Sequence, residues 1–181
     1  NAQVLGLAGL VAFRLEELSE ATKLLERALE VDPEDAQLHN YLGMAMYDAK
    51  RPVSAYRAFR KALELDPDCG EAQFNLAHCL ATGNGVTRND AQALVWMLEA
   101  AQQGLPSAQY LAGVMYAEGM GTRVDLDLAI QWLGRAAHNG NLDAAKLRER
   151  LRASHGLEMV FVVRHLRVKN DWAWLQVGPQ S

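Results

Sequence analysis

The sequence contains few cysteines, and their spacing excludes a disulfide along one helix. Cys69 and Cys79 are the only two among 181 residues. Ten positions along one helix separate two Cα atoms by about 15 Å, whereas a disulfide requires Cα atoms within about 7 Å. We therefore expect two free thiols. This expectation favours a reducing compartment and leaves both cytoplasm and periplasm open.

Long apolar segments and excess positive charge are also missing. No apolar run approaches the roughly 20 residues that a membrane-spanning helix requires, so we expect no stable insertion into a membrane. The net charge is −4, which argues against nucleic-acid binding, because such proteins usually carry a basic surface. The first residues, Asn1-Ala2-Gln3, include no initiator methionine and no charged segment before an apolar core. We expect that the sequence begins inside a longer protein or after a removed signal peptide.

The sequence lacks the residue clusters that catalysis or metal binding requires. None of the five histidines lies four residues from another, and none completes a cysteine–histidine set with the spacing of zinc ligands. His78 and Cys79 are adjacent and point apart on a helix, which argues against a shared ion with Cys69. No serine occupies a nucleophile-elbow motif, and the acidic residues have the spacing of helix surface charges. We predict no enzymatic activity, no metal and no cofactor.

The sequence does contain an internal repeat of 36 residues. The two copies share alanines, glycines, an aromatic residue and a tryptophan at one spacing, which chance does not explain. A third copy begins at Asn141 and stops. The matched positions are Gln73/Gln109, Phe74/Tyr110, Gly83/Gly119, Gly85/Gly121, Asn89/Asp125, Ala93/Ala129, Trp96/Trp132 and Gly104/Gly140.

The paired glycines of this repeat raise the alternative of a phosphate-binding loop. A dinucleotide loop follows a buried strand and continues to a third glycine. Here residues 71–80 have helical apolar spacing, and Arg88 stands at the position of the third glycine. We therefore predict that Gly83 ends a helix in the left-handed conformation. We also predict that Asn89 and Asp125 cap the helices that follow the two loops.

The first part of the sequence has a related repeat of 34 residues, because residues 2–35 align with residues 36–69. Shared small residues let two helices approach closely, and a proline stops the second helix of each copy. The two repeats together predict eight helices in four antiparallel pairs. The matched positions are Gly9/Gly43, Ala21/Ala55, Leu25/Phe59, Ala28/Ala62 and Pro33/Pro67.

On these residues the chain resembles two known repeat families. Residues 1–69 resemble two tetratricopeptide repeats, with the glycine, alanine, aromatic and proline positions of the 34-residue pattern. Residues 70–140 resemble two Sel-one-like repeats of bacterial type, with the signature A-Q-[FY], G-x-G, [ND]-x(3)-A-x(2)-W and A-A-x(2)-G. The resemblance implies an all-α fold, a right-handed α-α superhelix built as a solenoid of four helix pairs. We expect Trp96 and Trp132 to be buried between successive repeats.

Two further segments follow the repeats. Residues 141–155 are rich in lysine and arginine and predict a capping helix with a polar outer face. Residues 156–181 are β-branched and aromatic and predict a short C-terminal β-hairpin, Met159–Val168 and Asp171–Val177. The hairpin is either the start of a truncated accessory domain or a segment packed on the last helices.

The basic residues of the cap give the chain a bipolar charge distribution. Residues 146–169 carry seven lysines and arginines and two glutamates, a local balance of +5. This segment is either an ordinary solvated surface or a contact for an acidic partner or membrane headgroups.

The first helix of each tetratricopeptide repeat lines a concave groove, and the resemblance assigns eight residues of this chain to it. Aromatic residues and methionine are enriched at recognition surfaces. We expect the groove to hold a segment of a protein or peptide partner, with Asn40 binding its backbone. Phe74 and Tyr110 are alternatively core residues. The eight residues are Phe13, Gln37, Asn40, Met44, Tyr47, Phe74, His78 and Tyr110.

The sequence therefore predicts a non-catalytic scaffold or adaptor. One alternative is a spacer that presents a C-terminal accessory domain. Another is a secreted enzyme-like protein, for which relatives with disulfide-linked Sel-one-like repeats set a precedent. This chain lacks paired cysteines within each repeat, which disfavours the second alternative. The oligomeric state and the identity of the partner stay open.

Overall fold

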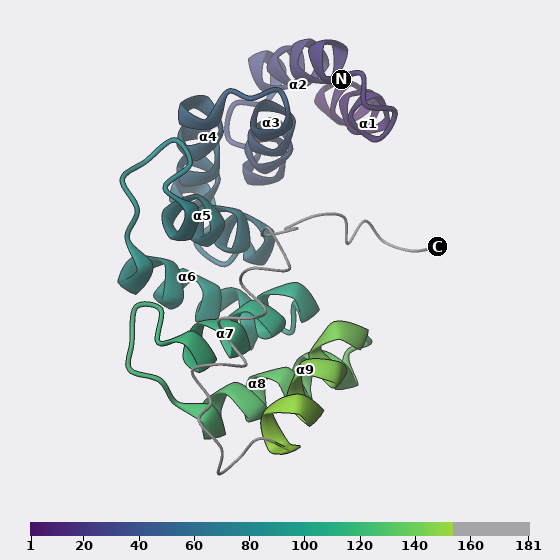
Figure 1. Ribbon diagram of the computed structural model, residues 1–181. Helices are drawn as coiled ribbons and strands as arrows, with labels where there is room; N and C mark the ends of the chain where they lie inside the picture. Colours follow the sequence, from purple (N-terminus) through teal and green to yellow (C-terminus); the bar gives the residue numbers. More distant parts are fainter. Residues whose placement is uncertain (154–181) are drawn as a thin grey trace. The chain divides into compact units, whose positions relative to one another are not determined.

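The computed structural model describes residues 1–153, which form nine α-helices and, within that range, no strand (Figure 1). The predicted number of helices, eight plus a ninth, is confirmed for this part of the chain. The predicted β-hairpin lies outside the described residues. The helices are α1 (Ala2–Arg14), α2 (Leu18–Val31), α3 (Ala36–Asp48), α4 (Pro52–Leu65), α5 (Gly70–Thr82), α6 (Asp90–Gln102), α7 (Pro106–Glu118), α8 (Leu126–His138) and α9 (Leu142–Ala153).

The chain divides into two compact units, of which the first is Asn1–Ala100 and the second begins at Ala101. In the first unit α1 packs on α2, α3 on α4, and α3 also contacts both α1 and α5. In the second unit α7 packs on α8, and α8 packs on α9. This is a helical-repeat, solenoid-like arrangement. Its right-handed superhelical course depends on how the units are joined and stays a prediction.

Close approach of paired helices explains the small residues that recur in the sequence. A Cβ atom on Gly9 would lie 2.7 Å from Cγ of Leu25, and one on Gly43 would overlap the ring of Phe59. Gly113 repeats this relation in the second unit, where an added Cβ would lie 2.7 Å from Cγ of Leu133. Each glycine therefore admits a large apolar side chain from the partner helix, and this pairing of small and large residues fills the core.

The predicted helix ends are confirmed at both glycine loops. Gly83 and Gly119 follow α5 and α7 with φ of 72° and 69°, in the left-handed region. The side chain of Asn89 accepts a hydrogen bond from the Gln92 backbone N–H at 3.0 Å. Asp125 caps α8 in the same way. The loops therefore connect helices, as their helical flanks predict, and do not follow a strand.

The two repeated tryptophans differ in burial. Trp132 on α8 is buried, with 9% of its surface exposed, and the guanidinium carbon of Arg135 lies 4.6 Å from its ring centroid. Trp96 on α6 is only half-buried. The prediction of burial is therefore confirmed for Trp132 and wrong for Trp96, which is only partly buried.

Candidate functional site

Seven of the eight predicted groove residues lie in the first unit. Phe13 is on α1 and Phe74 is on α5, and both are half-buried. The contacts of α3 with α1 and α5 place the first helices of successive repeats side by side. The remaining five residues come from α3 and α5: Gln37, Asn40, Met44, Tyr47 and His78.

Asn40 is a buried connector between α3 and α5. Its side chain is completely buried. Its Oδ1 accepts a hydrogen bond from Nδ2 of Asn75 at 2.9 Å, and its own Nδ2 donates to Oε2 of Glu71 at 3.4 Å. The expectation that Asn40 grips a partner's backbone is therefore wrong in its geometry, because the amide is occupied by α5 and covered.

Gln37 extends this link at the beginning of the two helices. Its Nε2 donates to Oε2 of Glu71 at 2.6 Å, so one carboxylate oxygen receives both amides of α3. The thiol of Cys69 donates to Oε1 of Gln37 at 3.6 Å. Gln37 is half-exposed, whereas Asn40 below it is buried. The polar network therefore reaches from the core to the surface of α3 and α5.

Tyr47 and His78 form the other end of this surface. Their ring centroids lie 5.4 Å apart with a tilt of 58°. Burial raises the pKa of Tyr47, and a hydrogen bond with the side chain of Asn84 opposes that shift. Asn84 belongs to the first glycine loop, so this loop contributes to the orientation of the Tyr47 ring. His78 is 8% exposed and forms part of the floor under Tyr47.

Tyr110 belongs to the packing of the second unit. It is half-buried on α7 and contacts the apolar cluster that includes Leu133, Leu147 and Leu151. Burial is the main cause of the raised pKa of its phenol. The alternative that assigned Tyr110 to the core therefore agrees with its surroundings.

The buried imidazole of His78 gives a prediction about pH. Burial lowers its pKa to about 4, whereas an unfolded histidine has a pKa of about 6.5. Between these values the unfolded chain binds more protons than the folded one, so the free energy of unfolding falls as pH drops. The loss attributable to His78 is at most about 3 kcal/mol.

Urea unfolding of the wild type and of His78→Gln between about pH 7 and pH 5 measures this loss. We expect the wild type to lose more stability than the variant as pH falls. Parallel pH profiles for the two proteins would contradict a buried neutral imidazole at this position.

The cysteines of residues 1–153 are buried thiols and belong to no metal-binding cluster in that range. Both thiols are free and buried, and burial raises the pKa of Cys79 to about 12, so this thiol stays protonated and poorly nucleophilic. No group of three histidine, cysteine or acidic side chains in this range could hold a metal ion. Likewise, none of the nine described helices has the length and apolarity to cross a membrane.

Two glutamines that sequence reasoning treated only as signature letters are structural residues. Gln73 and Gln109 are buried at 3% and 4% exposure. Nε2 of Gln73 donates to the carbonyl of Pro67 at 2.8 Å, and Nε2 of Gln109 donates to the carbonyl of Ala101 at 3.1 Å. Gln73 therefore ties the first turn of α5 to the connection before it, and Gln109 ties the first turn of α7 to the last turn of α6. The sequence indicated their importance only by placing a glutamine at the same position in both 36-residue copies.

Comparison with known families agrees with this construction. The tetratricopeptide repeat family matches residues 7–67, and the Sel1 repeat family matches residues 70–105 and 106–141. The chain belongs to the tetratricopeptide and Sel1 repeat proteins. Repeat proteins of these families generally mediate protein–protein interactions.

The curated relatives of this tetratricopeptide–Sel1 chain include fungal regulators and receptors. Chitin synthase regulatory factor 3 of Schizosaccharomyces pombe is 37% identical over 86 residues, which cover 46% of this chain and 9% of that protein. The peroxisomal targeting signal receptor of Kluyveromyces lactis is 37% identical over 73 residues, which cover 40% of this chain and 13% of that protein. The chain thus spans a small fraction of the length of these relatives, and the predicted bacterial type stays a prediction.

Several solved structures resemble the tetratricopeptide–Sel1 chain over most of its length. Among them is the crystal structure of YrrB, described as a TPR protein with an unusual peptide-binding site. The sequences are 26% identical, the TM-score is 0.60, and the match covers 82% of this chain and 75% of that one.

Proposed function

We propose that the chain is a non-catalytic scaffold that binds a peptide segment of a partner protein on the first helices of the first unit. The observation that carries this proposal is the half-exposed surface formed on α3 and α5 above a fixed polar floor. Met44, Tyr47 and Phe74 supply apolar and aromatic contact area there. Such residues contribute strongly to protein recognition because they bury large areas with few rotatable bonds.

The role of Asn40 in this proposal differs from the one that the sequence suggests. Asn40 bonds to Glu71 and Asn75 of α5, and the ring of His78 contacts that of Tyr47. The buried side chains of Asn40 and His78 therefore position the contact surface without touching the partner. A surface that is already fixed before binding loses less conformational entropy when the partner arrives.

The resemblance to other repeat proteins supports a peptide as the ligand. The relative from Kluyveromyces lactis is named as a receptor for a targeting signal, and YrrB is described as having a peptide-binding site. For this chain we propose only the class of ligand, a peptide segment with apolar side chains, because the surface above the floor is mainly apolar.

The test begins with affinity capture and mass spectrometry to identify a partner, followed by measurement of its dissociation constant. We expect Tyr47→Ala and Met44→Ala to weaken binding, with Tyr47→Ala costing at least about 2 kcal/mol, or roughly 30-fold. The exposed Lys23 of α2 provides the matched control, and Lys23→Ala should bind as the wild type does.

Tyr47 also contacts His78 and Asn84, so its replacement can affect stability as well as binding. Tyr47→Phe keeps the ring and removes only the hydroxyl, and we expect it to retain most of the affinity. If Met44→Ala and Tyr47→Ala both bind the identified partner with wild-type affinity while remaining folded, the proposed surface is wrong. The spacer function then becomes the better explanation.

A further inference from the structure

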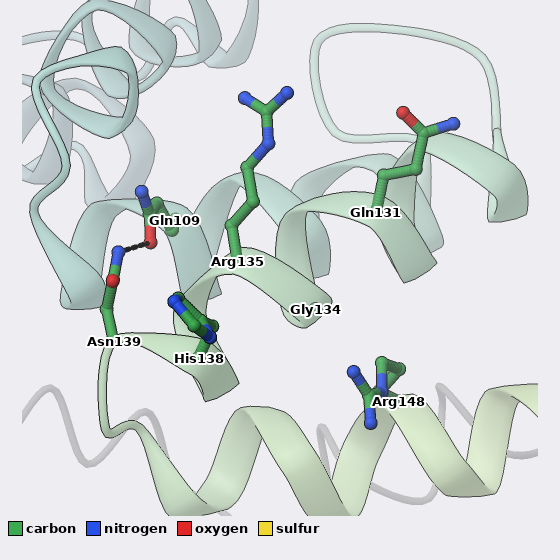
Figure 2. A pocket seen from close by; sticks show the side chains of 7 residues that line it. All are labelled: Gln109, Gln131, Gly134, Arg135, His138, Asn139 and Arg148. Atoms are coloured by element: carbon green, nitrogen blue, oxygen red, sulfur yellow. Dashed lines mark hydrogen bonds between the residues drawn. The ribbon is translucent and has the colours of Figure 1, made fainter.

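The described part of the second unit contains a shallow groove of about 530 Å³ with a basic lining (Figure 2). Arg135 and His138 come from α8, and Arg148 comes from α9. Gln109 and Asn139 lie at one end, where Nδ2 of Asn139 donates to Oε1 of Gln109 at 2.9 Å. The groove is separate from the peptide surface proposed above, which lies in the first unit.

The positive charges of this groove exceed the carboxylates that neutralise them. Nε and Nη2 of Arg148 donate to Oε1 of Glu149 at 3.3 and 3.1 Å. The same oxygen lies 3.5 Å from Nη1 of Arg152, so one carboxylate serves two guanidinium groups. Among the described residues, no carboxylate forms an ion pair with Arg135. Three arginines, Arg135, Arg148 and Arg152, therefore have one carboxylate between them, that of Glu149, which leaves a local excess of positive charge.

Arg135 is held in an orientation that suits recognition of an acid. Its guanidinium carbon lies 4.6 Å from the ring centroid of Trp132. A cation–π contact of this kind holds the guanidinium group over the aromatic ring and restrains its orientation. The N–H groups point outward in the plane of the guanidinium, and their fork geometry matches the two oxygens of a carboxylate.

Comparison of the two repeat copies shows that a glycine makes room for this arrangement. The 36-residue repeat aligns Gly134 with Leu98, and it aligns Arg148 with Ala112. A Cβ atom on Gly134 would lie 3.5 Å from Nη1 of Arg148. A leucine side chain there would extend into the space of that guanidinium. The second copy thus has a glycine where the first has a leucine, and the partial third copy has an arginine where the second has an alanine.

We propose that this groove, lined by residues of α7, α8 and α9, binds carboxylate side chains of an acidic segment of a protein partner. Arg135 and Arg148 receive the carboxylates, and the Gln109–Asn139 pair forms the polar end of the site. A solvated cap requires only polar side chains, and it does not require a glycine beneath an arginine or an arginine stacked on a buried tryptophan.

The test uses the full chain and an acetylated, amidated hexaglutamate peptide, with the matching hexaglutamine peptide and inorganic phosphate as comparisons. Titrations at about 0.15 M ionic strength suppress long-range attraction. We expect hexaglutamate to shift the side-chain Nε–H NMR signals of Arg135 and Arg148 saturably. Hexaglutamine should shift neither signal.

Variants separate this site from general charge attraction. Arg135→Gln should weaken hexaglutamate binding at least about tenfold, as loss of a charge-assisted hydrogen bond predicts. Gly134→Leu should weaken it similarly by filling the groove. The exposed Arg57 of α4 lies in the other unit, and Arg57→Gln, which removes the same charge, should leave the affinity within about twofold.

Three results would overturn the proposal. They are no saturable binding of hexaglutamate, an equal loss of affinity in Arg57→Gln and Arg135→Gln, and tighter binding of inorganic phosphate than of hexaglutamate. The last result would assign the groove to a free anion. Because Arg135 is exposed, its variant decides the outcome even if Gly134→Leu fails to fold.

Discussion

Gly85→Ala is expected to lower the free energy of unfolding by about 3–5 kcal/mol. Gly85 has a φ of 81°, where a residue with a Cβ atom is strained. A Cβ atom at this position would also overlap the carbonyl group of Pro52, at the start of α4, and would lie 2.8 Å from the backbone nitrogen of Val53. The neighbour is backbone, so no side-chain rotation can relieve the overlap.

Gly104→Ala provides the control for the conformational part of this effect. Gly104 also has a positive φ, of 92°, but no atom lies within 4 Å of its added Cβ. Its replacement should cost only about 1–2 kcal/mol. Urea unfolding monitored by circular dichroism measures both variants. Equal losses of unfolding free energy for Gly85→Ala and Gly104→Ala would show that Gly85 does not pack closely against the beginning of α4.

The same substitution connects stability to the proposed peptide surface. The loop that contains Gly85 also contains Asn84, whose side chain bonds to Tyr47. Moving the loop away from Pro52 therefore removes a constraint on the Tyr47 ring. On the proposed function, the first glycine loop would thus support the peptide surface as well as join α5 to α6.

The repeats made much of the fold predictable from the sequence. Helix ends at Gly83 and Gly119 and the caps at Asn89 and Asp125 depend on local backbone chemistry, which residue type determines directly. The close approach of paired helices at small residues was also predictable, and the structure shows which large residues fill the space: Leu25 at Gly9 and Phe59 at Gly43. These features recur in each copy, so each copy supports the other.

The details of the candidate site depend on contacts that residue types do not determine. Asn40 occupies a position that faces the groove in tetratricopeptide repeats, yet Asn75 and Glu71 of the following Sel1 repeat cover it. This network crosses the junction between a 34-residue and a 36-residue repeat. Neither repeat pattern alone contains it, so the burial of Asn40 could not be inferred from either family.

Trp96 illustrates a related limit. Its alignment with Trp132 predicts equal surroundings, but burial also depends on the residues around each tryptophan, which differ between the copies. Trp132 has Arg135 over its ring, whereas the equivalent position beside Trp96 is Glu99. A repeat therefore predicts the backbone position of a side chain more securely than its exposure.

Trp132→Ala is expected to lower the free energy of unfolding by about 3–5 kcal/mol. The ring is buried on α8, next in sequence to Leu133 of the apolar cluster, and its removal leaves a cavity that close-packed neighbours fill only in part. Trp96→Ala is the matched comparison, and it should cost less because the ring is already half-exposed. Urea unfolding of the two variants gives both values.

The Trp132 substitution also removes the aromatic face on which Arg135 rests. Trp132→Phe keeps an aromatic ring at this position, so it should retain more stability and more hexaglutamate affinity than Trp132→Ala. If Trp132→Ala and Trp96→Ala destabilise the chain equally, burial of Trp132 is not the source of its contribution. If Trp132→Ala stays folded and binds hexaglutamate as the wild type does, the stacked arginine is not what orients the carboxylate, and Arg148 alone must do so.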